Sequence, residues 1–148
     1  MEETLIGYIM IRVLSSPVLL LAFLFVIFIL HIFAISSNWY WDFDGLDSVY
    51  HFIGGSWSAL LFFYIFFKRE RIFSITSYPW TTAIFALGFV ALIGVGWEFF
   101  EFGFDYIFAE YETVRKAQLG VYDIMVDLFS DLIGGAMISL IFIRASRR

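Results

Sequence analysis

The chain of 148 residues is 61% hydrophobic, 22% aromatic and only 16% charged, with a mean hydropathy of +0.87 and a formal net charge of −5. A water-soluble domain of this size needs a larger share of charged residues to cover its surface, so the composition indicates an integral membrane protein. The absence of cysteine excludes thiolate chemistry, disulfides and cysteine-ligated clusters.

The first expected span follows an apolar stretch, residues 1–14, that is interrupted by Glu2, Glu3 and Arg12. This stretch fits either an interfacial helix or an early turn of the first span. Its acidic start differs from the basic start of a secretory signal, so no cleavable signal is predicted. A transmembrane helix is expected over 17–36, where Pro17 opens a segment that is apolar except for His31.

Three further spans are expected. Aromatic and acidic residues at 38–45 predict a short loop at the level of the lipid headgroups, followed by spans over 47–67, 80–107 and 121–143. The predicted fold class is therefore all-α: a polytopic membrane protein with a four-helix transmembrane bundle that forms a single domain over 1–148.

The basic residues predict the orientation of this bundle, because Lys and Arg are retained on the cytoplasmic side. One side would carry Arg12, Lys68, Arg69, Arg71, Arg144, Arg147 and Arg148, and the other only Arg115 and Lys116. We therefore expect a multi-pass protein of the cell membrane with both termini cytoplasmic. Most of the acids then fall in the outer half.

The last span carries Asp123, Asp127 and Asp131 at intervals of four residues in an otherwise apolar segment. Residues spaced in this way lie within an arc of about 80° on one helical face. A charge near the middle of a bilayer costs roughly 2.5–3.5 kcal/mol on insertion scales, so this face is expected to look into protein, water or an ion.

Three more polar residues are expected in the same layer, near the outer face. At about 1.5 Å per residue, His51 lies roughly 6–8 Å below the outer interface, and Glu98 and Glu101 share a face at a comparable depth. No Lys or Arg within the spans can pair with these acids. Neighbouring carboxylates repel one another unless they share protons or hold a cation.

A bound divalent cation is the simplest way to offset the repulsion between these carboxylates. The expected metal ligands are His51, Glu98, Asp127 and Asp131. Carboxylates with one imidazole favour Mg²⁺, Ca²⁺ or Mn²⁺, and Zn²⁺ or Fe²⁺ also fit.

A repeat is suggested by two inward-running segments. Asp47 to Gly55 and Asp127 to Gly135 share the pattern D-x3-[H/D]-x-I-G-G, as if a helical hairpin had been duplicated. Such a repeat would bring His51 towards Asp131, and the glycine pairs of the two helices would pack together.

Other interpretations remain open for several residues. Asp47 and Asp123 stand in first helical turns, where a carboxylate can simply cap the helix. His31 is expected to be a hydrogen-bonded structural or interfacial residue, although paired with His51 it would also suit a haem. Nucleic-acid binding and nucleotide hydrolysis have no support, because the chain has no phosphate loop and no basic cluster beyond what topology requires.

Three sequence blocks carry most of the polar residues of the spans: DSVYHFIGG, WEFFEF and YDIMVDLFSDLIGGA. They resemble blocks of the YjdF-like inner-membrane proteins and, more distantly, of the VanZ-like family linked to teicoplanin resistance. The residues that match the YjdF-like pattern are Asp47, His51, Gly55, Glu98, Glu101, Asp123 and Asp127. Asp131 replaces an apolar residue of that pattern, and it stands where the VanZ-like pattern usually has asparagine. The resemblance implies a membrane protein of the cell envelope without supplying a mechanism.

Three functional hypotheses follow. In the first, the cation polarises a lipid headgroup, Glu101 or Asp123 acts as general base, and Arg115 and Lys116 bind an anionic headgroup. In the second, the acids bind and carry a cation or a proton. In the third, the metal is structural and the protein is a scaffold. The inner turns of the spans lack acids and histidines, which favours a site open to one side only.

Overall fold

The computed structural model describes residues 9, 11–14, 16–70, 77–108 and 115–146, and these residues form helices and connections without a strand. The main helices are α2 (Pro17–Ser36), α4 (Leu46–Phe62), α5 (Pro79–Phe108) and α6 (Val121–Ser146). A short helix, α3 (Trp39–Asp42), precedes α4, and a π-helical segment, η1 (Phe63–Arg69), continues it.

Four of the described helices are long and apolar enough to cross a membrane, which confirms the predicted all-α fold class. They are Pro17–Ser36, Leu46–Arg69, Pro79–Phe108 and Val121–Ser146, each close to its expected bounds. Before α2, residues 11–14 are helical, and Ile11 and Leu14 pack against the core. Most of the interval 1–14 lies outside the described residues, so its two interpretations stay open.

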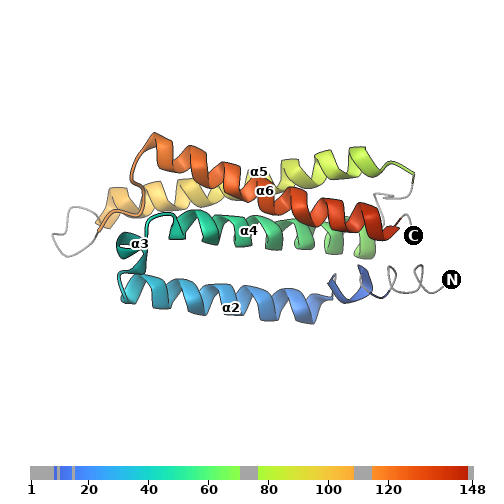
Figure 1. Cartoon of the computed structure of the whole chain (residues 1–148), viewed down its shortest axis with the longest axis horizontal. Coiled ribbons are helices and arrows are strands. Elements are labelled where there is room, and N and C mark those ends of the chain that lie inside the picture. Colours follow the sequence, from blue (N-terminus) through green and yellow to red (C-terminus); the bar gives the residue numbers. More distant parts are fainter. Residues whose placement is uncertain (1–8, 10, 15, 71–76, 109–114, 147–148) are drawn as a thin grey trace.

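The bundle is built around α4 and α6, which run side by side and make the most extensive helix contact (Figure 1). Glycines make their close approach possible: a methyl group at Gly55 would overlap with the backbone carbonyl of Asp131, and one at Gly134 with that of Phe52. One glycine of each pair thus lies at the crossing of α4 and α6, whereas Gly135 faces Val90 of α5, so the packing of the two pairs against each other stays a prediction. The duplication itself stays a prediction.

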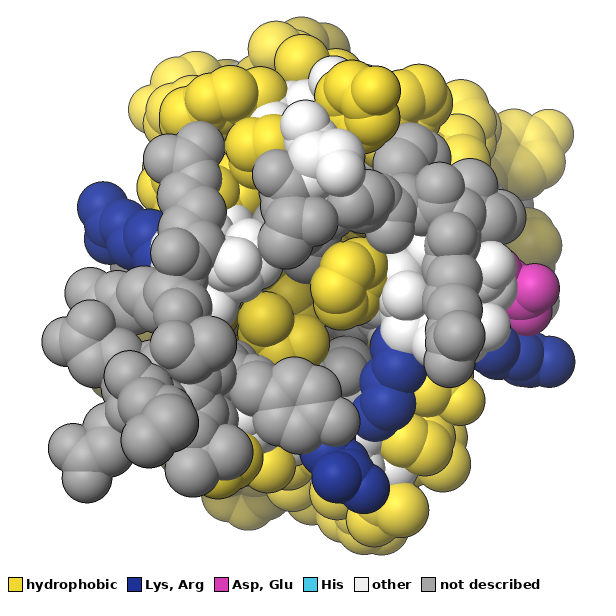
Figure 2. All heavy atoms as spheres, turned by 90° about the vertical axis from the view of Figure 1, so that its right-hand side faces the viewer, with side chains coloured by type: hydrophobic (Ala, Val, Ile, Leu, Met, Phe, Trp, Pro, Cys, Tyr) yellow, Lys and Arg dark blue, Asp and Glu magenta, His cyan; other side chains and the backbone are white. Residues whose placement is uncertain are grey.

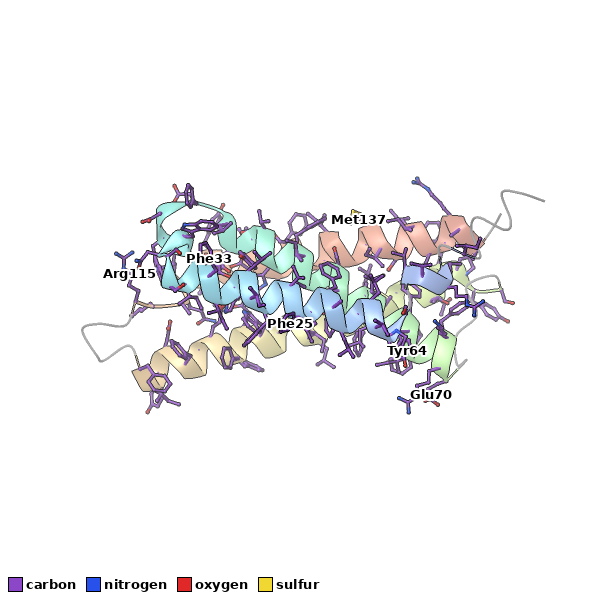
Figure 3. The ribbon with its side chains drawn as sticks, turned by 90° about the horizontal axis from the view of Figure 1, so that it is seen from below. Phe25, Phe33, Tyr64, Glu70, Arg115 and Met137 are labelled. Atoms are coloured by element: carbon purple, nitrogen blue, oxygen red, sulfur yellow. The ribbon has the colours of Figure 1, made fainter. Side chains whose placement is uncertain are left out.

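The outer helices differ in how well they are packed. α5 contacts both α4 and α6, whereas α2 packs mainly on α4 and buries only Leu20 and Ala34. Seen from the α2 side, Phe25 and Phe33 lie on its outer surface (Figure 3), where they are 64% and 49% exposed. Such a surface suits lipid rather than water.

The half of the bundle away from α3 is closed by aromatic packing. The rings of Phe63 and Phe142 stack at a centroid distance of 4.2 Å, and both side chains are fully buried. Nearby hydroxyls are satisfied locally, since Ser139 donates to the Gly135 carbonyl and Thr82 to that of Tyr78. A polar path through this half is not visible in the described residues.

The two ends of the bundle carry different groups. α3 and the start of α6 lie at one end, and the carboxyl-terminal part of α6 lies at the other (Figure 1). Figure 2 shows that second end, where the exposed Lys and Arg side chains among the described residues are Arg12, Lys68, Arg69 and Arg144. These four basic residues thus share one end, as expected, while the assignment of that end to the cytoplasm stays a prediction.

Candidate metal centre

The centre is built around His51, in the second turn of α4. Its Nδ1 lies 3.2 Å from Asp131 Oδ2 on α6, within hydrogen-bond distance. Its Nε2 points the other way, 4.0 Å from Asp47 Oδ1 and 3.9 Å from Glu98 Oε1. The two nitrogens of one imidazole therefore face different carboxylates.

Two atoms of this group lack a hydrogen-bond partner within the described part of the chain: His51 Nε2 and Glu98 Oε1. Both residues are buried, at 5% and 6% exposure. Buried polar atoms are normally paired, and separations of 3.9 and 4.0 Å are too long for hydrogen bonds. Two ligands that each lie about 2.0–2.3 Å from one ion can be separated by such a distance.

Glu98 is held by a residue from the connection between α5 and α6. The Nε2 amide of Gln118 donates to Glu98 Oε2 at 2.9 Å and to the Glu98 backbone carbonyl at 3.0 Å. The backbone amides of Ala117 and Gln118 in turn donate to the carboxylate of Asp105. This network leaves Glu98 Oε1 directed towards the imidazole.

Asp127 completes the inner wall of the centre. Its side chain is 2% exposed, and Ser48 donates a hydrogen bond of 2.9 Å to its Oδ1. Ligand atoms of Asp47, His51 and Asp127 lie within 4.8 Å of one another, and so do those of His51, Glu98 and Glu101. His51 belongs to both groups and links α4 to α5 and α6.

Asp131 is packed against helix backbones. A methyl group at Gly94 of α5 would overlap with Asp131 Oδ2, and the Asp131 backbone lies against Gly55. Its carboxylate therefore fits between three helices only because α4 and α5 carry glycines at these positions. It is placed to orient the imidazole of His51.

The two candidate general bases have different surroundings. Glu101 is 8% exposed, and its Oε1 accepts a hydrogen bond of 2.9 Å from the indole of Trp97. Asp123, in the first turn of α6, accepts one of 3.0 Å from the Leu119 amide. Asp123 thus takes up the helix-start role that the sequence left open, and Glu101 lies nearer the imidazole.

The two basic candidates lie at the loop end. Arg115 stacks over the ring of Trp41 at 5.3 Å and lies at the end of the bundle opposite Glu70 (Figure 3). Lys116 is exposed, and its backbone carbonyl is 3.4 Å from the Trp41 indole nitrogen. Arg115 lines the pocket described below.

His31 is hydrogen-bonded, as expected of a structural residue. Its Nδ1 lies 2.6 Å from the Tyr40 hydroxyl, and its ring is surrounded by Tyr40, Tyr50 and Trp97. Burial, followed by the nearby Asp47 carboxylate, raises the pKa of Tyr40 above its usual value. The phenol therefore keeps its proton and can donate a hydrogen bond to Nδ1 of His31.

Two cavities meet at the centre. The outer pocket, of about 520 Å³, reaches from Arg115 and Asp123 to Asp47 and Glu101. A second cavity, the side chamber, has about 220 Å³ and lies between α2, α4 and α5, next to His51 and Asp131. Both cavities contact His31, Tyr40, Asp47 and Trp97.

Three contributions are not predicted from the sequence. The position of Asp47 in a first helical turn suits a helix cap, although its spacing of four residues from His51 also places the two side chains on one helical face. Ser48 and Gln118 carried no signal, because a single hydroxyl or amide gains a role only through the partner that it meets.

The comparisons with known proteins support the class of the chain. A family model described as "Predicted membrane protein (DUF2238)" matches residues 6–148. It covers the three blocks on which the YjdF-like resemblance rests, while the VanZ-like link is not supported. No curated protein and no solved structure matches significantly.

Proposed function

We propose that this chain, which belongs to the DUF2238 family of predicted membrane proteins, holds a divalent cation between α4, α5 and α6 and uses it to hydrolyse a membrane lipid at its headgroup. The observation that carries the proposal is the buried, unpartnered Nε2 of His51 opposite the unpartnered Oε1 of Glu98. Asp131 on the opposite ring nitrogen supports it, because a carboxylate commonly orients a metal-binding histidine in this way.

The proposed ligands are His51 Nε2 with carboxylate oxygens of Asp47, Glu98 and Asp127. We assign Asp131 to orienting the imidazole, although the sequence suggested it as a direct ligand. Three carboxylates and one imidazole suit Mg²⁺, Ca²⁺ or Mn²⁺, and Zn²⁺ or Fe²⁺ also accept this donor set.

The proposed reaction is the hydrolysis of a phosphoester. A bound cation would polarise a phosphoryl oxygen and lower the pKa of a coordinated water. Glu101 takes a proton from the attacking water, whose oxygen forms the new bond to phosphorus. As the bond between phosphorus and the ester oxygen breaks, Glu101 returns this proton to that oxygen, and the group leaves as an alcohol. Glu101 suits this role better than Asp123, whose carboxylate is engaged at the start of α6.

The headgroup would enter the outer pocket from the loop end. Arg115 lines this pocket, and its guanidinium can pair with phosphate oxygens in a bidentate manner. Lys116, which is exposed beside it, would add to the local attraction for phosphate. With both termini cytoplasmic, the centre faces the outer side of the cell membrane.

The two rival functions use the same acids differently. A cation or proton carrier needs a polar path to the other side, and the stacked rings of Phe63 and Phe142 occupy the inner half of the bundle. A scaffold with a structural metal needs no large cavity beside the ion, whereas the outer pocket of about 520 Å³ lies there.

Metal content and metal-dependent stability test the proposal. Purified protein should carry a divalent cation in equimolar amount by mass spectrometry, and chelation should lower its melting temperature. Restoring the ion at a hundredfold excess over its dissociation constant should raise the free energy of unfolding by about 2.7 kcal/mol. Glu98→Gln and Asp127→Asn keep the side-chain shape and should abolish this increment, whereas Asp42→Asn in α3 should not. If chelation leaves the melting temperature unchanged and no metal copurifies, the cluster is a set of proton-sharing carboxyls. That result would favour the cation or proton carrier over the hydrolase.

A further inference from the structure

We propose that the lipid recognised at this centre is a phospholipid with an ammonium-bearing headgroup, and that one of its acyl chains lies in the side chamber between α2, α4 and α5. The inference rests on the proposed function only for the reaction, since binding of the lipid can be measured without turnover.

The side chamber has the chemistry of an acyl-chain site. Its walls are largely apolar: Leu24, Ile27 and Phe28 come from α2, and Ile93 and Trp97 from α5. Its acids and histidines gather towards the metal centre, at His31, Asp47, His51 and Asp131. A molecule with an apolar tail and a polar head would therefore bind in one direction only.

The chamber is accessible from the bilayer. Leu24, Phe28 and Ile93 line it and are also 40%, 58% and 42% exposed on the lipid-facing surface. α2 and α5 make little direct contact in the described residues, so the gap between them is bridged by side chains rather than by packed backbones. A chain can thus pass sideways from the membrane.

The inner end of the chamber is closed. The indole of Trp57 on α4 donates a hydrogen bond of 2.9 Å to the Leu20 carbonyl on α2. Trp57 lies six residues beyond His51, which corresponds to about 9 Å along the helix. Only part of a long acyl chain fits, and the rest would remain between α2 and α5 in the bilayer.

The outer pocket adjoins this chamber, because His31, Tyr40, Asp47 and Trp97 line both. The proposed lipid lies across this boundary, with its headgroup in the outer pocket and its acyl chain in the side chamber. His51 lines the chamber at this boundary. Its buried Nε2 has no hydrogen-bond partner among the described residues.

The lining of the outer pocket favours a positive group on the lipid. Carboxylates come from Asp44, Glu101 and Asp123, and aromatic rings come from Tyr40, Trp41, Phe100 and Phe104. Acids and aromatic faces together attract an ammonium group. Arg115 supplies a guanidinium for the phosphate. A zwitterionic phosphoethanolamine satisfies both kinds of group, whereas a purely anionic headgroup meets excess negative charge.

Photocrosslinking in lipid nanodiscs tests the inference. The full chain with its copurified metal is reconstituted with phosphatidylethanolamine or phosphatidylglycerol that carries a diazirine in the middle of one acyl chain. Adducts are then mapped by mass spectrometry. Trp57 and Ser58 are the reporters, because both line the chamber and Ser58 is only 2% exposed. We expect phosphatidylethanolamine to label both residues, and phosphatidylglycerol to label them much less.

Filling the chamber supplies a matched control. Ile27→Trp should reduce the label on Trp57 and Ser58 about tenfold, because a larger side chain in the chamber competes with the lipid. Val26→Trp, on the lipid-facing surface next to it, should leave the label unchanged. If Ile27→Trp fails to fold, Ile93→Trp against Leu92→Trp makes the same comparison on α5.

The outcomes separate the parts of the inference. Equal labelling by phosphatidylglycerol would overturn the headgroup assignment. Labelling restricted to exposed residues such as Phe25, or unaffected by the filling variants, would overturn the acyl site. Glu98→Gln should lose the metal and still show chamber labelling, so failure of the metal proposal is distinguishable from failure of this one.

Discussion

At the scale of single residues, the division of labour between the two nitrogens of His51 defines the centre. Nδ1 faces Asp131, and Nε2 faces the space between Asp47 and Glu98. A carboxylate on one nitrogen fixes the tautomer and the ring orientation, and so prepares the other nitrogen to bind a cation. Substitutions of Asp131 and of Glu98 should therefore have different effects on cation binding.

Asp131→Asn tests this division. We expect the ion to bind with an affinity about 10–100-fold lower, with the stoichiometry at saturation unchanged, because an orienting partner has been weakened while the ligands remain. Glu98→Gln should instead abolish binding in the accessible concentration range. Isothermal titration with Mn²⁺ measures both. Loss of all binding in Asp131→Asn would restore this residue to the role of direct ligand that the sequence suggested.

At the scale of helices, the crossing of α4 and α6 brings the ligands together. Gly55 and Gly134 let the two backbones touch one turn deeper than the centre, and Gly94 leaves room for the Asp131 carboxylate on the α5 side. Small residues permit such close helix packing inside a membrane. The distance between His51 and Asp131 is therefore set by glycines that have no chemistry of their own.

Gly55→Ala should destabilise the protein, because the added methyl group overlaps with the Asp131 backbone and forces α4 away from α6. Overpacking of this kind typically costs about 1–3 kcal/mol. Gly88→Ala, in the middle of α5 with nothing within 4 Å of the added atom, should be neutral or stabilising by up to about 1 kcal/mol. Thermal unfolding in detergent measures both variants. Equal melting temperatures would show that the crossing tolerates a wider separation.

At the scale of the whole molecule, charge is separated along the bundle axis. The carboxylates of the centre and Arg115 lie towards the α3 end, and the exposed Arg12, Lys68, Arg69 and Arg144 lie at the other. Since basic residues are retained in the cytoplasm, this asymmetry predicts that the centre faces the outside.

Cysteine labelling tests the orientation, and the cysteine-free chain gives no background. Asp42→Cys in α3 should react with a membrane-impermeant maleimide on intact cells. Glu70→Cys, at the opposite end of the bundle, should react only after permeabilisation. The reverse pattern would invert the topology and place the centre on the cytoplasmic side.

Much of the architecture could be predicted because it depends on local properties of the chain. The length of the apolar segments and the position of Pro17 predicted the helices to within a few residues. The rise per residue predicted that His51, Glu98, Asp127 and Asp131 share a layer, and the repeated pattern predicted that His51 meets Asp131.

Hydropathy and helical rise therefore suffice to predict the class of the protein, the number and extent of its spans and the depth of its polar residues. The packed bundle, in contrast, sets which atom each residue presents to its neighbours. It turned Asp47 towards His51, brought Gln118 onto Glu98 and engaged Asp123 at the start of α6. These contacts depend on the rotation of each helix about its axis and on the path of the connections, which are set by packing between residues far apart in the chain.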